Sequence, residues 1–285
     1  GVDYMPYVLL MNDINNDLIG HTEWLFNNVV QLAYSTGFDY RLVFFLYSLA
    51  TVLLVVGGLK SYSIQNRIWY LTIYALTPLM FLTSFNGIRQ YLCVAYLFFL
   101  WMNNRKNVAL WLVSIFIHKS AILVLPIFYL LSRRTSLITW LLIFCCIVLL
   151  EYLVWDSFRD ISMYFSRKVI KGDMTMVYLN VLLGVVGLIL FRNNRDIQGI
   201  FIVNLVLSLF AMISNISTQF VLRLTQYFTI FYPMAIITFV NNNKTQKWLL
   251  PIIMLFILLY FIRNVYMIGH TTNLLPYESV FSLHS

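Results

Sequence analysis

The chain has 285 residues, of which 61% are hydrophobic and only 11% are charged, and its formal net charge is +8. A soluble domain carries about 25% charged residues, so these few charges could not cover a soluble core this apolar. The composition therefore predicts a polytopic membrane protein. No basic run reaches five residues, so we interpret the positive charge as the usual excess of cytoplasmic loops and expect no nucleic-acid partner.

Apolar stretches follow one another along the chain, and we expect each to form a transmembrane or re-entrant helix. Their approximate bounds are 42–60, 68–85, 88–103, 107–117, 119–132, 136–154, 175–191, 197–214, 220–240 and 248–266. The sequence thus predicts an all-α fold: a polytopic integral membrane helical bundle of about ten helices. We expect a single transmembrane domain over residues 1–285.

The fourth and fifth stretches are short, and His118 and Lys119 separate them. As helices, each would rise only about 15–20 Å. Residues 107–132 can therefore form a re-entrant hairpin, two short spans or one helix that is broken at His118. The charges of the neighbouring loops favour two short helices.

Five short connections between the stretches are basic, and Asp196 is their only acidic residue. These connections are residues 60–67, 105–106, 133–134, 192–196 and 244–247. Since short basic loops face the cytoplasm, we place all five on that side. The other acidic residues lie elsewhere, so both termini and the long segments 1–41 and 154–174 are predicted to face outward. We expect segment 1–41 to contain an amphipathic helix.

Among the basic residues on the predicted outward side, Arg89, Lys119 and Arg223 lie within apolar stretches and share polar stripes or a helix break with other polar residues. A charged side chain at the centre of a membrane helix costs about 2.5–3.5 kcal/mol on insertion scales, so such residues are usually kept for an anionic partner. The alternative is that the side chains extend to lipid headgroups, and Lys119 fits this alternative best. Polar stripes on the same helices predict a cavity that opens outward. The stripes contain Asn86 and Arg89; Asn204, Ser208 and Asn215; and Gln219, Arg223, Gln226 and Tyr227.

Candidates for a general base are His118, Asp3 and Glu23. His118 beside a helix break can instead be a buried histidine that binds a carbonyl, and a loop carboxylate is most often merely solvated. The aromatic residues of segment 1–41 can stack on sugar rings or lie in the interfacial belt. The sequence shows no HExxH motif, no P-loop and no cysteine spacing typical of a metal site, so we expect neither a metal nor another cofactor.

Several pieces of the sequence match one family. They are GVDYMPY at 1–7, the amphipathic stretch with Glu23, FNGIRQYLCVAYLFF at 85–99, FIHKSAIL at 116–123, and Arg223 with Tyr227 one turn later. Through these pieces the chain resembles the EpsG family of bacterial exopolysaccharide and O-antigen polymerases, the Wzy-type enzymes. Family members usually carry a transmembrane helix before the first piece, which implies that this helix is missing here. Cys93 stands where the family usually has a small residue.

The resemblance implies a glycosyltransferase-type polymerase that passes several times through the bacterial cytoplasmic (inner) membrane. Its substrate would be an undecaprenyl-pyrophosphate-linked glycan, used in the synthesis of lipopolysaccharide O-antigen or exopolysaccharide. The growing chain would be transferred from its lipid carrier onto a new lipid-linked repeat at the outer face of the membrane. The lipid bilayer and a chain-length regulator protein are the other expected partners.

Such a reaction needs cations for the leaving pyrophosphate, which Arg89, Lys119 and Arg223 would supply. It also needs a base for the acceptor hydroxyl. Because a carboxylate among cations stays ionised and is the weaker base, we favour His118 as the base and Asp3 or Glu23 for orienting the sugar. The expected substrate contacts are Asn86, Gln90, Tyr4 and Tyr227.

Other functions fit the composition less well. A flippase for the same lipid-linked sugar would usually show two related halves, which the sequence lacks. A membrane acyltransferase would need a catalytic partner for His118, whose neighbours in the sequence are only Lys119 and Ser120. A non-catalytic export or assembly subunit would not explain outward cations on helices that line a cavity.

Overall fold

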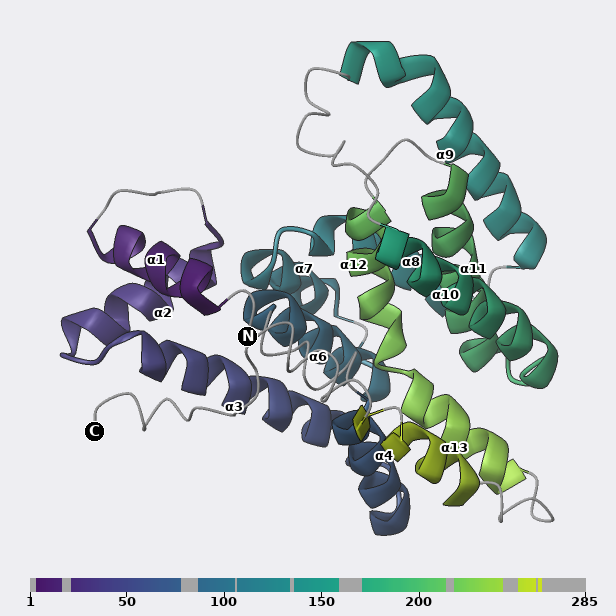
Figure 1. Ribbon diagram of the computed structural model, residues 1–285, viewed down its shortest axis with the longest axis horizontal. Helices are drawn as coiled ribbons and strands as arrows, with labels where there is room; N and C mark the ends of the chain where they lie inside the picture. Colours follow the sequence, from purple (N-terminus) through teal and green to yellow (C-terminus); the bar gives the residue numbers. More distant parts are fainter. Residues whose placement is uncertain are drawn as a thin grey trace. The chain divides into compact units, whose positions relative to one another are not determined.

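The computed structural model describes residues 4–16, 22–77, 87–105, 107–133, 136–158, 171–213, 218–242, 251–259 and 261–262 (Figure 1). Within these ranges the chain forms α-helices and contains no strand, as the all-α prediction requires. The helices are α1 Tyr4–Asn15, α2 Trp24–Ser35, α3 Tyr40–Gly58, α4 Ile64–Leu76, α6 Ile88–Met102, α7 Val108–Ile117, α8 Ala121–Ser132, α9 Leu137–Phe158, α10 Lys171–Leu190, α11 Arg195–Ile213, α12 Thr218–Thr229 and α13 Tyr232–Asn242. Residues 251–259 are helical as well.

Two of the described helices, α3 and α11, are each 19 residues long and apolar enough to cross a membrane. A helix of this length rises about 28 Å, close to the thickness of the hydrocarbon layer. Shorter apolar helices accompany them: Ile88–Met102, Val108–Ile117, Ala121–Ser132, Leu137–Cys146 and Val177–Leu190. All of these lie at predicted apolar stretches, while the number of membrane crossings stays a prediction.

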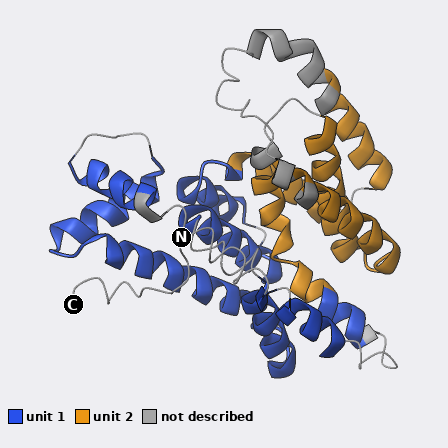
Figure 2. Ribbon diagram, viewed as in Figure 1, with its two compact units in different colours: residues 1–121, 236–285 blue, residues 122–235 orange. Residues whose placement is uncertain are grey.

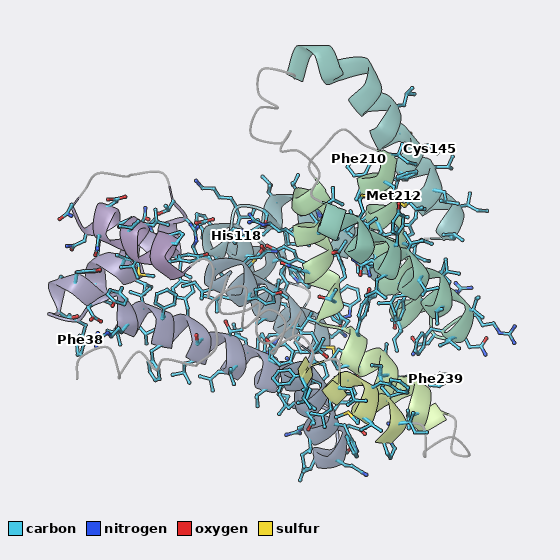
Figure 3. All side chains as sticks on the ribbon, in the orientation of Figure 1. Phe38, His118, Cys145, Phe210, Met212 and Phe239 are labelled. Atoms are coloured by element: carbon cyan, nitrogen blue, oxygen red, sulfur yellow. The ribbon has the colours of Figure 1, made fainter. Side chains whose placement is uncertain are left out.

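The helices group into two compact units, which Figure 2 shows in blue and orange. Unit 1 contains residues 1–121 and 236–285, and unit 2 contains residues 122–235. In unit 2, α11 packs against α9, α10 and α12. Phe210 of α11, labelled in Figure 3, meets Phe144 of α9 with ring centroids 6.4 Å apart.

In unit 1, α6 is buried along most of its length and packs against α3 and α7. Gly58 of α3 lets α6 approach closely, because a Cβ atom at Gly58 would lie 2.8 Å from a ring carbon of Phe98 on α6. On the side of α7, Cys93 is fully buried, and its thiol lies 3.5 Å from the carbonyl oxygen of Ser114. The cysteine therefore fits the position where the family resemblance led us to expect a smaller residue.

Helix α2 positions the N-terminal part of the chain within unit 1, since it packs against α1, α3 and α7. The hydroxyl of Tyr34 on α2 donates a 2.7 Å hydrogen bond to Asn12 on α1. Asp39 begins the next helix by accepting a 2.9 Å hydrogen bond from the backbone N–H of Arg41, the usual role of an N-cap aspartate. The predicted outward segment 1–41 thus holds two helices, α1 and α2, where one amphipathic helix was predicted.

The structure decides between the alternatives for one predicted stretch and corrects another. Residues 107–132 form two helices, with His118 in an extended conformation between them, so a single continuous helix is excluded. The stretch 220–240 was predicted as one helix, and this was wrong, because α12 ends at Thr229 and α13 begins at Tyr232. Pro233 explains the break, since proline has no N–H to donate and its ring clashes with the carbonyl of residue 229. Within the predicted loop 154–174, α9 continues to Phe158 and α10 begins at Lys171, and residues 159–170 lie outside the described ranges.

Candidate functional site

A buried carboxylate joins two basic side chains in unit 1. Glu23 precedes α2, Arg89 lies in the first turn of α6, and His118 follows the last residue of α7. One carboxylate oxygen of Glu23, Oε2, pairs with Nη1 of Arg89, and the other, Oε1, lies 2.8 Å from Nδ1 of His118. The Glu23 side chain is only 6% exposed, whereas Arg89 and His118 are 20% and 22% exposed. The two basic groups are therefore partly accessible, and the carboxylate behind them is not.

The local fold shows that Glu23 serves the cluster and not its own helix. It stands at the N-cap position of α2 with extended backbone angles, yet its side chain makes no capping hydrogen bond. A carboxylate at this position would normally accept from the first-turn N–H groups. Here it reaches α6 and α7 instead. The Glu23 carboxylate therefore does not cap α2 and instead contacts Arg89 and His118, which lie 66 and 95 positions later in the sequence.

Arg89 occupies a helix end that does not favour a cation. It is the second residue of α6 after the N-cap Gly87, and the N-terminus of a helix carries a partial positive charge. A cation there is destabilising unless an anion compensates it, which Glu23 does. His118 lies at the C-cap of α7, where a positive charge is favoured. Figure 3 shows it on the side of α7 that faces α1 and α2.

Aromatic rings form a wall around the guanidinium of Arg89. Its Cζ atom lies 4.9 Å from the ring centroid of Phe26 and 5.3 Å from that of Tyr7, both cation–π distances. Its Nε lies 3.4 Å from the Tyr7 hydroxyl oxygen. The rings of Phe44 and Tyr47 on α3 continue the wall, at 6.1 Å from Tyr7 and 5.7 Å from Phe26 respectively. The guanidinium therefore lies against aromatic rings of α1 and α2, and α3 supports these rings from behind.

The electrostatics keep Glu23 ionised. Burial acts to raise the pKa of this carboxyl, but the hydrogen bond with His118 and the positive charge of Arg89 outweigh burial and lower the pKa to about 2. Segment 1–41 therefore holds a permanent anion near neutral pH. Such a carboxylate is a strong hydrogen-bond acceptor and a poor proton acceptor.

The contact with Glu23 fixes the histidine tautomer. An ionised carboxylate can only accept hydrogen bonds, so Nδ1 of His118 carries the proton, and in the neutral ring Nε2 is the nitrogen with a free lone pair. A carboxylate behind a histidine orients the ring and stabilises the imidazolium that forms when the outer nitrogen takes a proton. Arg89 provides a planar group suited to phosphate oxygens. Together these groups can accept a proton and stabilise an anionic leaving group.

The structure places the other predicted site residues as follows. Gln90 is buried in α6, and Lys119 is exposed in the turn after His118. Arg223 is exposed and Tyr227 buried on α12 of unit 2, so their grouping with Arg89 stays a prediction. Asp3, Asn86 and the side chain of Tyr4 lie outside the described residues.

The sequence analysis considered Tyr7 and Phe26 only among the aromatic residues of segment 1–41, and it missed Phe44 and Tyr47. Phe26 is three positions after Glu23, and Tyr47 is three positions after Phe44, so each pair shares one helix face. That spacing could have indicated them. In the part of the chain that the structure describes, no three His, Cys, Asp or Glu side chains group as metal ligands would.

Comparisons with known proteins give one match. Curated proteins and solved structures show none. The model of the EpsG family matches residues 1–279, nearly the whole chain. The apolar helices of the chain are consistent with a membrane protein. The chain therefore belongs to the EpsG family, which implies a polymerase-type function in the biosynthesis of exopolysaccharide.

Proposed function

We propose that the cluster of Glu23, Arg89 and His118 is the active site of a glycan polymerase. The proposed reaction joins undecaprenyl-pyrophosphate-linked repeats at the outer face of the bacterial cytoplasmic membrane, through which the chain passes several times. The observation that supports it best is the buried carboxylate that bridges a partly accessible arginine and a partly accessible histidine. The product would be O-antigen or exopolysaccharide, and a chain-length regulator protein is a further proposed partner.

In the proposed reaction, Nε2 of His118 accepts the proton of the acceptor hydroxyl. The hydroxyl oxygen forms a bond to the anomeric carbon of the donor sugar, and the bond between that carbon and the pyrophosphate oxygen breaks. The electron pair of the broken bond stays on the pyrophosphate, and the proton leaves later from the imidazolium. Glu23 orients the ring and stabilises its positive charge.

Arg89 receives the charge that develops on the leaving group. Its contacts with Glu23 and Tyr7 use Nη1 and Nε, and a guanidinium has five N–H donors in a planar fork. A phosphate bound in the bidentate manner takes two parallel N–H groups of this fork, so the pyrophosphate would share or replace the contact that Arg89 makes with Glu23. We also propose that Lys119 and Arg223 add positive charge. Asn86, Gln90, Tyr4 and Tyr227 would bind the sugars, and Asp3 would help to orient them.

One observation favours a second function. The acyltransferase interpretation lacked a catalytic partner for His118, and the structure supplies one, because Glu23 lies 2.8 Å from Nδ1. A histidine with a carboxylate behind it can also activate a sugar hydroxyl for attack on an acyl donor. An acyltransferase would modify single repeats without joining them, whereas the polymerase joins unmodified repeats. The chain length of the product separates the two functions.

The test is polymer formation by the purified full chain with lipid-linked repeats. We expect His118→Gln and Arg89→Ala each to lower the rate about a hundredfold or more, since each removes a base or an electrostatic stabiliser of that magnitude. Arg89→Lys should lose most of the activity too, because lysine keeps the charge without the planar fork.

Arg133→Ala is the matched control. This arginine also lies over an aromatic ring, Tyr129, at 5.2 Å, but it is exposed and belongs to a connection that we predict to face the cytoplasm. We expect near-normal polymer from it. Normal chain lengths from Arg89→Ala or His118→Gln would contradict the proposed site. In a parallel reaction with an activated acyl donor added, acylated single repeats from the unmutated protein would favour the second function.

A further inference from the structure

Tyr47 carries a buried hydroxyl that has nothing to bind in the described part of the chain. The residue is 3% exposed, and its hydroxyl oxygen has no hydrogen-bond partner there. Leaving such a group unpaired is unfavourable, and buried tyrosine hydroxyls usually find a partner. The position therefore requires an explanation beyond packing.

The surroundings of Tyr47 belong to the candidate site. Its ring packs edge-on against Phe26 at 5.7 Å, and Phe26 in turn contacts the guanidinium of Arg89. The same guanidinium pairs with Glu23, an ionised carboxylate that can only accept hydrogen bonds. The ring that carries the unused donor is thus linked through Phe26 and Arg89 to a carboxylate whose present partners are Arg89 and His118.

The proposed reaction makes Glu23 and the substrate compete for Arg89. A pyrophosphate carries at least two negative charges, and two anions on one guanidinium repel each other. As the pyrophosphate binds, the carboxylate oxygen that faces Arg89 loses part of its stabilisation. Because Glu23 is buried, an unpaired oxygen there would be costly. A second donor within reach of the carboxylate would remove this cost.

We propose that Tyr47 is a positioning residue that donates its hydroxyl to Glu23 when the pyrophosphate of the substrate takes over Arg89. This inference rests on the proposed function and adds a residue to its site. Tyr47 touches neither the substrate nor the reacting atoms. It keeps Glu23 anchored, and with it His118, while the guanidinium turns to the phosphate oxygens.

The experiment compares the full chain in detergent with its Tyr47→Phe variant, with and without inorganic pyrophosphate. The first measurement is the thermal midpoint without pyrophosphate. We expect it to be unchanged or raised by Tyr47→Phe, since the substitution removes only an unpaired hydroxyl. The second is the dissociation constant for pyrophosphate by calorimetry, which we expect to rise about tenfold, the loss typical of one hydrogen bond to a charged group.

A third measurement combines Tyr47→Phe with Glu23→Gln. If the hydroxyl serves the displaced carboxylate, Tyr47→Phe should have little further effect on pyrophosphate binding once that carboxylate is absent. Tyr96→Phe is the control, because the Tyr96 hydroxyl already donates a 2.8 Å hydrogen bond to the carbonyl of Leu110. It should lower the midpoint and leave pyrophosphate binding unchanged.

The results of these measurements test the role of Tyr47 and the proposed active site separately. No pyrophosphate binding by the unmutated chain would overturn the proposed site, and this inference with it. Equal binding by the unmutated chain and Tyr47→Phe would overturn the role of Tyr47 alone. A midpoint lowered by Tyr47→Phe as much as by Tyr96→Phe would also overturn it, because the hydroxyl would then be paired without pyrophosphate.

Discussion

The ion pairs of Glu23 should contribute measurable stability, and Glu23→Gln tests that contribution. Glutamine has nearly the same shape, but its single side-chain oxygen can accept from only one of Arg89 and His118, so the substitution removes the charge and alters one of the two hydrogen bonds. The pKa of Glu23 is lowered from 4.5 to about 2 in the folded protein. Each tenfold difference in proton affinity corresponds to about 1.4 kcal/mol.

The pH dependence of this contribution to the free energy of unfolding follows from the linkage between protonation and folding. A carboxyl whose pKa is lowered by folding stabilises the protein above the unfolded value of 4.5, and this stabilisation is lost as the pH falls through about 2. The contribution is about 3 kcal/mol near pH 7 and falls to about 1 kcal/mol near pH 3. We therefore expect Glu23→Gln to be less stable than the unmutated chain by about these amounts.

The measurement is the free energy of unfolding in detergent at both pH values, for the unmutated chain and for Glu23→Gln. Taking the difference between the two proteins at each pH cancels the titration of groups that do not interact with Glu23. Asp39→Asn provides the comparison, since the Asp39–Arg41 pair lies at the surface at 3.5 Å and such pairs contribute at most about 1 kcal/mol. A difference between the unmutated chain and Glu23→Gln that is equal at both pH values would refute the reasoning.

Two further predictions concern α3. Ser35 and Ser61 lie beyond its opposite ends and are exposed, so in a chain without native cysteines an impermeant thiol reagent should label Ser35→Cys in intact cells and spare Ser61→Cys. The reverse pattern would contradict the outward position of segment 1–41. Gly58→Ala should lower stability by about 1–3 kcal/mol in the same unfolding assay, because its Cβ atom would lie 2.8 Å from the buried ring of Phe98. Gly57→Ala, whose Cβ atom would lie 3.2 Å from Phe99, should cost less, and an equal loss would argue against tight packing at Gly58.

The helices that the sequence predicted well are those marked by long apolar runs. Hydropathy locates α3 and α11 within a few residues because a span needs a sustained apolar surface. The break at His118 was also foreseeable, since two polar residues interrupt an apolar run there. The break between α12 and α13 was missed although Pro233 was visible. A proline bends or ends a membrane helix depending on whether neighbouring helices satisfy the freed carbonyls, and sequence alone does not supply those neighbours.

For the candidate site, the sequence indicated the residues but not the contacts between them. Arg89, His118 and Glu23 were each singled out from the sequence, but nothing local indicates that they meet, because 66 and 95 residues separate the carboxylate from its partners. In the sequence, the only neighbours that could act on His118 were Lys119 and Ser120. In the structure Lys119 is exposed, and the anion Glu23 lies against the ring. The sequence indicated the chemistry of each residue, whereas the pairing of Glu23 with Arg89 and His118 depends on how α2, α6 and α7 pack.

The pairing has a consequence for selectivity. With a neutral His118, the negative charge of Glu23 and the positive charge of Arg89 cancel, so on the proposed function the cluster would present no net charge to lipid headgroups. An unpaired arginine would bind the phosphodiester of any phospholipid, which carries one negative charge. To displace Glu23, a ligand must attract the guanidinium more strongly than a buried carboxylate does. A pyrophosphate, with at least two charges on adjacent phosphates, meets that requirement better than a phosphodiester. On the proposed function, Glu23 therefore favours the lipid-linked substrate over the bilayer in which it is dissolved.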